Sequence, residues 1–158
     1  MQLDDAEIMR LSRLSRIAAL ELVHLQQTDG RLFGQLLSAH VLAEKCKDIG
    51  FSEQLDAFVA RFGRLQDLLG DKFLPAWLKV MQEVPGTALE NLDKAEKLGL
   101  VSNADDWFAT RKLRNLMVHE YLQDPEALFD ALIAAHRAVP MLAATCKALI
   151  QRTDRLMV

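Results

Sequence analysis

Apolar residues recur at three- and four-residue intervals along almost the whole chain, and no long stretch alternates apolar with polar residues as a half-buried strand would. This pattern predicts an all-α fold. A first helix is expected from about Asp4 to Thr28, with Asp29-Gly30 at its exit. A second helix is expected over Arg31 to Ile49, and Gly50 should end it.

The middle of the chain predicts a third helix and a shorter fourth one. Ser52 is placed to cap a helix that runs through Leu69, and Gly70-Asp71 should interrupt or bend it. The fourth helix is expected over Lys72 to Val84, because Pro75 suits a helix start and the following Pro85-Gly86 pair marks a turn.

The remaining helices carry clearer start signals. Thr87 and Glu90 have the spacing of a capping box, and Gly99 is placed to stop that helix after Leu98. Asn103 is expected to cap the next helix. The final helix should begin at Asp124-Pro125-Glu126, run toward Gln151 and bend at Pro140.

Length and composition indicate one globular domain over residues 1–158. The chain is 51% hydrophobic and 26% charged, with only 7 Gly and 4 Pro, which argues against disorder. Its first residues, Met1 to Asp5, are acidic where a secretion signal would be basic, and no uninterrupted apolar run approaches the roughly 20 residues of a membrane span. We therefore expect a soluble, cytoplasmic protein without a membrane segment.

Charge and ligand-type residues limit the possible chemistry. With a net charge of -3, the chain lacks the overall positive charge that is typical of general nucleic-acid-binding proteins. RNA contact would therefore need a local basic patch. Cys46 and Cys146 lack disulfide-framework or zinc spacing and are expected to be buried hydrophobes. The pair Glu21 and His24 has the Glu-x-x-His spacing of di-iron bundles, but His40, His119 and His136 have no glutamate three residues earlier. Structural or surface roles are expected for His24, His40 and His136, with no metal and no cofactor.

The segment from Arg111 to Tyr121 collects the residues best suited to chemistry. The imidazole of His119 can take the proton of a ribose 2′-hydroxyl, while the Arg114 guanidinium stabilises a charged phosphorus transition state. Asn115 can orient the imidazole or a phosphate oxygen, and Tyr121 can bind phosphate, stack on a base or be modified. Arg111 and Lys112 would add local positive potential that binds RNA.

Helical geometry places limits on this site. Trp107, Arg114 and Tyr121 fall on one stripe, with Asn115 and His119 on the neighbouring one, while Leu113, Leu116 and Met117 should face the bundle. Arg114 and His119 are about 140° apart on an ideal helix, so a shared site requires the long arginine side chain, a frayed helix end or a second subunit.

Other polar and aromatic residues admit simpler explanations. Arg, Asn and His on a helix are commonly solvated or capping groups. Arg61, Arg64 and Asp67 would extend an RNA groove or, as we favour, form exposed ion pairs within one helix. Trp77 and Trp107 are expected in the core or an interface rather than in a base-stacking site.

The segment Arg114-Asn-Leu-Met-Val-His119-Glu-Tyr121 resembles the R-x4-6-H motif of HEPN domains. It is most similar to the R-N-x-x-x-H-x-Y form found in HepT-like toxins encoded beside minimal nucleotidyltransferases. The chain length, the helical pattern and the penultimate position of the motif helix also resemble this family, as does the aromatic and basic stretch from Arg61 to Asp67 less distinctively.

The resemblance implies an antiparallel four- or five-helix bundle that forms a homodimer, with motif helices from both subunits lining an RNA-cleaving cleft. Arg114 and His119 would be the catalytic pair of a metal-independent endoribonuclease toxin, with tRNA as one possible RNA substrate. A cognate nucleotidyltransferase antitoxin would silence the toxin by adenylylating Tyr121, the single tyrosine of the chain. The alternative is a non-catalytic helical partner or substrate-binding subunit of a nucleotidyltransferase.

Overall fold

The computed structural model describes residues 4–36, 38–119 and 123–158, and every regular element within them is helical. α1 spans Asp5–Phe33, and its N-cap Asp4 accepts a hydrogen bond from the Ala6 amide at 3.0 Å. The helix is longer than its sequence signals predicted, because Thr28 and Leu32 remain buried on either side of Gly30. A glycine inside a helix costs only about 1 kcal/mol, which this burial offsets.

The predicted helix over Arg31 to Ile49 is wrong. Its first residues belong to α1, and only the short α2, Ala39–Lys45, forms in the middle of the range. Ser38 caps α2 by accepting a hydrogen bond from the Val41 amide at 3.1 Å. The predicted end at Gly50 is also wrong, because α3 has already begun there.

α3 spans Ile49–Asp67 and is capped by Asp48, whose carboxylate accepts a hydrogen bond from the Phe51 amide at 2.8 Å. Asp48 therefore takes the role that the sequence assigned to Ser52. The chain then passes without a break through a π-helical turn, η1 (Leu68–Phe73), into α4 (Leu74–Val80). Gly70-Asp71 widens the helix rather than ending it.

Pro75 gives a physical reason for the wide turn. Proline has no amide hydrogen to donate to the carbonyl four residues earlier, and its ring crowds that carbonyl. The neighbouring Leu74 amide bonds the Leu69 carbonyl, five residues back, which is the π-helical pattern. α4 ends at Val80 rather than at the predicted Val84.

α5, Ala88–Lys97, begins with the predicted capping box. The Thr87 amide donates to the Glu90 carboxylate and the Glu90 amide to the Thr87 hydroxyl, both at 3.2 Å. Gly99 follows with a φ of 76°, a left-handed conformation that suits glycine after a helix. Both signals are confirmed.

The last two helices also begin where the sequence indicates. α6 spans Ala104–His119 after a cap at Asn103, which accepts a hydrogen bond from the Asp106 amide at 3.0 Å. α7 spans Pro125–Leu156, and Asp124 caps it by accepting from the Ala127 amide at 3.1 Å. α7 continues through Pro140 and past the predicted end at Gln151.

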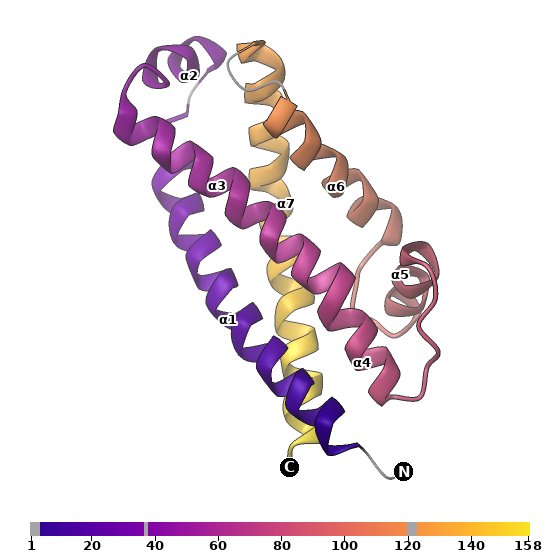
Figure 1. Ribbon diagram of the computed structural model, residues 1–158. Coiled ribbons are helices and arrows are strands. Elements are labelled where there is room, and N and C mark those ends of the chain that lie inside the picture. Colours follow the sequence, from indigo (N-terminus) through magenta and orange to yellow (C-terminus); the bar gives the residue numbers. More distant parts are fainter. Residues whose placement is uncertain (1–3, 37, 120–122) are drawn as a thin grey trace.

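The long helices form an antiparallel up-down-up-down bundle, which confirms the all-α prediction (Figure 1). α1 and α6 lie on opposite sides of the pair α3 and α7, and each packs on both members of that pair. The largest fully buried side chains are Trp107, Phe58, Phe62 and Phe73. They belong to one continuous apolar core that extends through the length of the bundle.

α7 is long and apolar enough to cross a membrane by length and composition alone, with a mean hydropathy of 1.4 over an 18-residue window. A core helix of a soluble protein meets the same criterion. Here Leu132, Leu142 and Leu149 are fully buried, and the helix packs against α1, α2 and α6. Packing in the bundle accounts for part of its apolar composition, since 39% of that window is buried.

Candidate functional site

α6 carries the R-N-x-x-x-H-x-Y segment and is anchored through its first half. Trp107 and Thr110 are almost fully buried, and the Thr110 hydroxyl donates to the Asp106 carbonyl at 2.8 Å. From α3, the Gln66 side-chain amide donates to the Trp107 carbonyl at 3.2 Å. These contacts set the rotation of α6 about its axis and hence the direction in which each motif residue projects.

Arg114 projects toward α3, where its guanidinium forms an ion pair with Asp67. The stem of the side chain lies across Gly63, and a Cβ built there would stand 2.6 Å from Nε and 2.8 Å from Cδ of Arg114. Such distances are closer than van der Waals contact allows, so this path requires glycine at residue 63. The Asp67 carboxylate thus binds the guanidinium, and the missing side chain of Gly63 leaves room for the arginine stem.

The pair remains open to solvent on one side, because the side chains of Arg114 and Asp67 keep 41% and 38% of their exposure. A guanidinium has five N–H donors in a planar fork, and the pair with Asp67 uses only part of them. Arg114 can therefore still donate to a bound anion. The carboxylate beside it lowers the net positive charge that such an anion meets.

His119 is the final residue of α6, and its side chain lies outside the described part of the structure. Tyr121 lies outside the described residues altogether. Whether the imidazole meets the Arg114 guanidinium, in one subunit or across two, stays a prediction.

The other motif residues divide between two faces of α6. Asn115 and Lys112 are exposed, whereas Arg111 is half-buried. Arg114 and Asn115 therefore do not share one surface, because Arg114 turns toward α3 and Asn115 toward solvent. Their side chains leave the helix about 100° apart, so one neighbour cannot face both.

The apolar side of α6 is also narrower than predicted. Met117 is fully buried and Leu113 packs against the core, but Leu116 is 47% exposed. Leu116 and the 55% exposed Val118 lie outside the narrow stripe that α3 and α7 cover. The prediction that Leu116 faces the bundle is wrong, and both residues add apolar surface beside the motif.

The charged residues of α3 bind neighbouring helices instead of one another. Arg61 donates to the Thr28 hydroxyl and, at 3.3 Å, to the His24 carbonyl. Arg64 pairs with Glu21 at 3.5 Å. With Asp67 bound to Arg114, the favoured interpretation of ion pairs within one helix is wrong, and Arg61 and Arg64 fasten α3 to α1.

Of the possible metal-binding pair, only Glu21 takes part in these contacts with its side chain. One Glu21 oxygen pairs with Arg64, whereas Arg61 binds the backbone carbonyl of His24. Among the described residues, no cluster of three or more His, Cys, Asp or Glu side chains could hold a metal ion. His136 packs against the ring of Phe33 at 4.3 Å and binds Asp29 through Nδ1 at 2.7 Å.

Both cysteines are free thiols, and burial raises the pKa of each. Cys146 is fully buried, its pKa is raised to about 11, and its thiol lies 3.6 Å from the Ala18 carbonyl. A thiol with so high a pKa is almost entirely protonated at neutral pH and is a poor nucleophile. The prediction of a buried hydrophobe is confirmed for Cys146, whereas Cys46 is half-buried.

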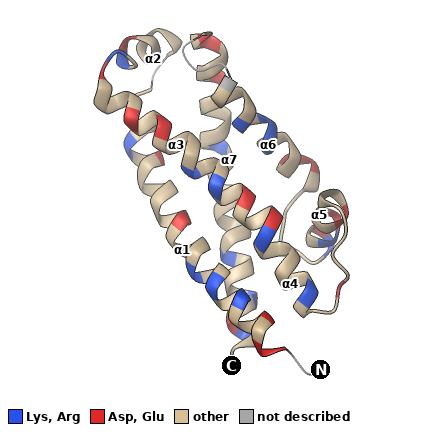
Figure 2. Ribbon diagram, viewed as in Figure 1, with Lys and Arg blue, Asp and Glu red and all other residues tan. Residues whose placement is uncertain are grey.

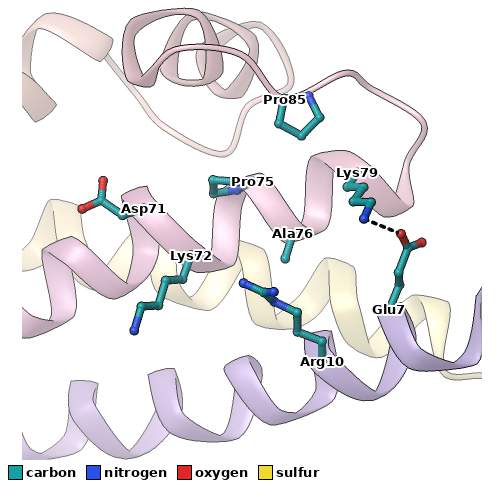
Figure 3. Close-up of a pocket in the computed structure, with 8 residues that line it drawn as sticks. All are labelled: Glu7, Arg10, Asp71, Lys72, Pro75, Ala76, Lys79 and Pro85. Carbon is teal, nitrogen blue, oxygen red and sulfur yellow. Dashed lines mark ion pairs between the residues drawn. The ribbon is translucent and has the colours of Figure 1, made fainter.

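Hollows on the surface lie mostly away from the motif. One of about 190 Å³ lies where α1 meets η1 and α4, and Figure 3 shows Arg10 and Lys72 beside it. Its third cation, Lys79, is paired with Glu7 at 3.0 Å. A hollow of about 200 Å³ adjoins the motif helix at Met117 and Val118.

Comparisons with protein-family models, with curated proteins and with solved structures find no match for this chain.

Proposed function

We propose that the chain is a HEPN-like, metal-independent endoribonuclease that acts as a cytoplasmic homodimer, with Arg114 and His119 as its catalytic pair. In this proposal it is the toxin of a module whose antitoxin is a nucleotidyltransferase. The observation that carries the proposal is the position of Arg114. Its guanidinium is held by Asp67 and Gly63 yet keeps 41% of its exposure, as a preorganised anion-binding group should.

The proposed reaction needs only side chains of this chain. Neutral His119 removes the proton of a ribose 2′-hydroxyl, and the 2′-oxygen attacks the adjacent phosphorus. The bond from phosphorus to the 5′-oxygen then breaks, and that oxygen takes a proton from water or from a second imidazole. Arg114 stabilises the extra negative charge on the phosphoryl oxygens in the transition state. The products are a 2′,3′-cyclic phosphate and a free 5′-hydroxyl.

The decisive experiment measures cleavage of total cellular RNA by the purified protein in the presence of EDTA. We expect Arg114→Ala and His119→Ala each to reduce cleavage by about 100-fold or more, because each removes a group that acts in the transition state. His40→Ala and Arg155→Ala are matched controls on exposed positions of α2 and α7. Equal cleavage by the wild type and both motif variants would overturn the proposal.

Tyr121 is the proposed modification site, which rests on the family resemblance and on its being the single tyrosine of the chain. Incubation with the neighbouring nucleotidyltransferase and ATP should add AMP to the protein, as seen by intact-mass measurement. The added mass should be absent in Tyr121→Phe. Equal modification of this variant would place the AMP elsewhere.

A non-catalytic nucleotidyltransferase partner is the second candidate. It is favoured by the Arg114–Asp67 pair, which gives the arginine a structural role, and by the exposed Leu116 and Val118 beside it. An apolar surface next to polar groups is typical of protein contacts. Under this alternative, Leu116→Asp should weaken a complex with the nucleotidyltransferase while no RNA is cleaved.

A further inference from the structure

The outward face of α1 exposes large apolar side chains that the bundle does not use. Met9, Ile17, Leu20 and Val23 retain 69%, 43%, 58% and 47% of their exposure. They lie on one side of a single helix, opposite the residues that α1 buries in the bundle, such as Leu11, Ala18 and Leu25. Exposed apolar groups gathered in this way mark an interaction surface more often than scattered ones do.

Met9, Leu20 and Val23 belong to a regular exposed stripe, which we call the α1 seam, and Ile17 lies beside it. Its members follow one another at alternating spacings of four and three residues, as in a helix that packs along another helix. The α1 seam consists of Met9, Arg13, Arg16, Leu20, Val23, Gln27, Gly30 and Gly34, all of them exposed.

We propose that the α1 seam binds the α1 seam of a second copy of this chain, in antiparallel orientation about a two-fold axis. In this register Leu20 faces Val23 at the centre, and the pairing repeats in both directions by symmetry. Farther out, Arg16 faces Gln27. Arg13 faces Gly30 at the next position, and Met9 faces Gly34 at the last.

Side-chain size is self-complementary in this register. At the two outer positions, the long side chains of Met9 and Arg13 meet glycines of the C-terminal half. A Cβ added at Gly30 or Gly34 would meet nothing within 4 Å, so the space over both glycines is open in one copy. Longer side chains of the second copy can fill that space. A flat apolar patch would offer no such space.

Charge favours the antiparallel orientation. Arg13 and Arg16 lie in the N-terminal half of the seam, which has no acidic member. Side by side in a parallel pair, they would face their own copies. Antiparallel pairing separates the two Arg16 residues by about 16 Å along the axis, beyond the Debye length of about 8 Å. It also brings Arg13 toward the negative C-terminal end of the partner helix, although Arg31 lies nearby and must turn to solvent.

The length of the seam is sufficient for a small specific contact. From Met9 to Gly34 it covers about 38 Å of helix, and a contact of this length buries on the order of 1,000 Å², the lower range of specific interfaces. RNA would suit the arginines, which are visible as a basic stretch of α1 in Figure 2. It would leave Leu20 and Val23 uncovered, so a second copy fits the surface better.

This pairing leaves both α6 helices free. Because α1 and α6 lie on opposite sides of the bundle, the two α6 helices lie on the far sides of the dimer. The α1 dimer therefore does not depend on the proposed ribonuclease site. If the motif helices also pair with one another, two different two-fold contacts generate a tetramer or a longer assembly.

Sedimentation equilibrium of the full chain tests the contact. Leu20→Arg should weaken self-association by about 100-fold. The measured mass should then fall from dimer to monomer, or from tetramer to dimer. Val84→Arg is the matched control, since Val84 is 78% exposed and lies outside the seam. An identical mass for wild type, Leu20→Arg and Val84→Arg would overturn the proposal.

A charge test at Gly30 separates contact from misfolding, since both variants replace a helical glycine with a better helix former. Gly30→Glu faces Arg13 of the second copy and should tighten association roughly three- to tenfold, because symmetry creates the ion pair twice. Gly30→Arg should weaken it by a similar factor. Equal effects of the two variants would contradict the register.

The remaining alternative is that the α1 seam binds RNA and not a second copy of the chain. A wild type that stays monomeric, and that retains RNA on a filter only while Arg13 and Arg16 are present, would overturn the α1 dimer. Loss of RNA cleavage after His119→Ala with unchanged self-association would leave the α1 dimer standing. Failure of the ribonuclease proposal and failure of the dimer are therefore distinguishable.

Discussion

The two sides of α3 make contact with their neighbours in opposite ways. Toward α1, α3 contributes large side chains: Phe58 packs edge-to-face on Phe33 at 4.9 Å, and Arg61 reaches Thr28. Toward α6, the chain contributes the polar side chains of Gln66 and Asp67 and two glycines. Gly63 admits the stem of Arg114, and Gly70 in η1 lies beside the indole of Trp107, whose Nε1 would be 3.2 Å from an added Cβ.

On its α1 side, α3 is held by large buried side chains. On its α6 side, glycines leave room for side chains of α6. The α1 side gains stability from buried area, which depends on residue volume. On the α6 side, the glycine fixes the position of the Arg114 side chain, because the arginine can follow this path only where the opposing helix has no Cβ. We expect mutations to affect the two sides differently.

The largest effect is expected from Phe58→Ala. It removes a fully buried ring on the α1 side and should lower the free energy of unfolding by about 3–5 kcal/mol in urea titration. Val59→Ala on the half-buried neighbouring position should cost clearly less. Equal losses for the two variants would contradict the view that buried volume holds this side.

The next effect concerns Cys146, which fastens α7 to α1 beside the Ala18 carbonyl. Burial raises its pKa to about 11, whereas an exposed thiol in the unfolded chain has a pKa of about 8.5. The folded state thus holds its proton more tightly, so its contribution to stability is complete below pH 8.5 and is lost as pH rises toward 11. Between these limits the free energy of unfolding should fall by about 2–3 kcal/mol more than in Cys146→Ala. Parallel pH profiles for the two proteins would contradict this prediction.

Gly63→Ala tests the gap on the α6 side. The new Cβ would stand 2.6 Å from Nε of Arg114, so the arginine must leave its path, and we expect a loss of about 1–2 kcal/mol. In an Arg114→Ala background the sign should reverse. Alanine then gains its helix preference of about 0.5–1 kcal/mol without a clash. A double-mutant cycle by thermal unfolding measures both steps, and no coupling between the two sites would show that Arg114 does not need the glycine.

The smallest effect is expected from Asp67→Asn. The ion pair with Arg114 is well over a third exposed on both sides, so solvent screens it and its loss should cost less than about 1 kcal/mol. The difference from wild type should shrink in 0.5 M salt, to about the level of Asp56→Asn, an exposed carboxylate on the same helix. A large, salt-independent loss would mean that Asp67 supports the bundle by other contacts.

Local sequence signals predicted helix starts well. The caps at Thr87, Asn103 and Asp124 are confirmed because an N-cap depends on a few adjacent residues that accept hydrogen bonds from exposed amides. The predicted helix ends at Gly30 and Gly50 are wrong, whereas a π-helical turn interrupts the α-helix at Gly70 as predicted. Glycine lowers helix stability only modestly, and burial of neighbouring residues outweighs that cost.

The candidate site shows the same division. The order of Arg114, Asn115, His119 and Tyr121 identified the segment and suggested its chemistry from the sequence alone. The sequence did not indicate that Arg114 would lie over Gly63 and bind Asp67, since the partner residues are 51 and 47 positions away. The signal that comes nearest is Gly63 itself, a glycine among buried residues of a helix.

By itself, the sequence determined the helical class, most helix starts and the identity of the chemical groups, because periodicity and capping act within a few residues. Only the tertiary structure decided which side of α6 faces α3, which charges pair across helices, and which face of α1 stays uncovered. The rotation of a helix about its axis is set by side-chain volumes on its neighbours, and these volumes come from distant parts of the chain.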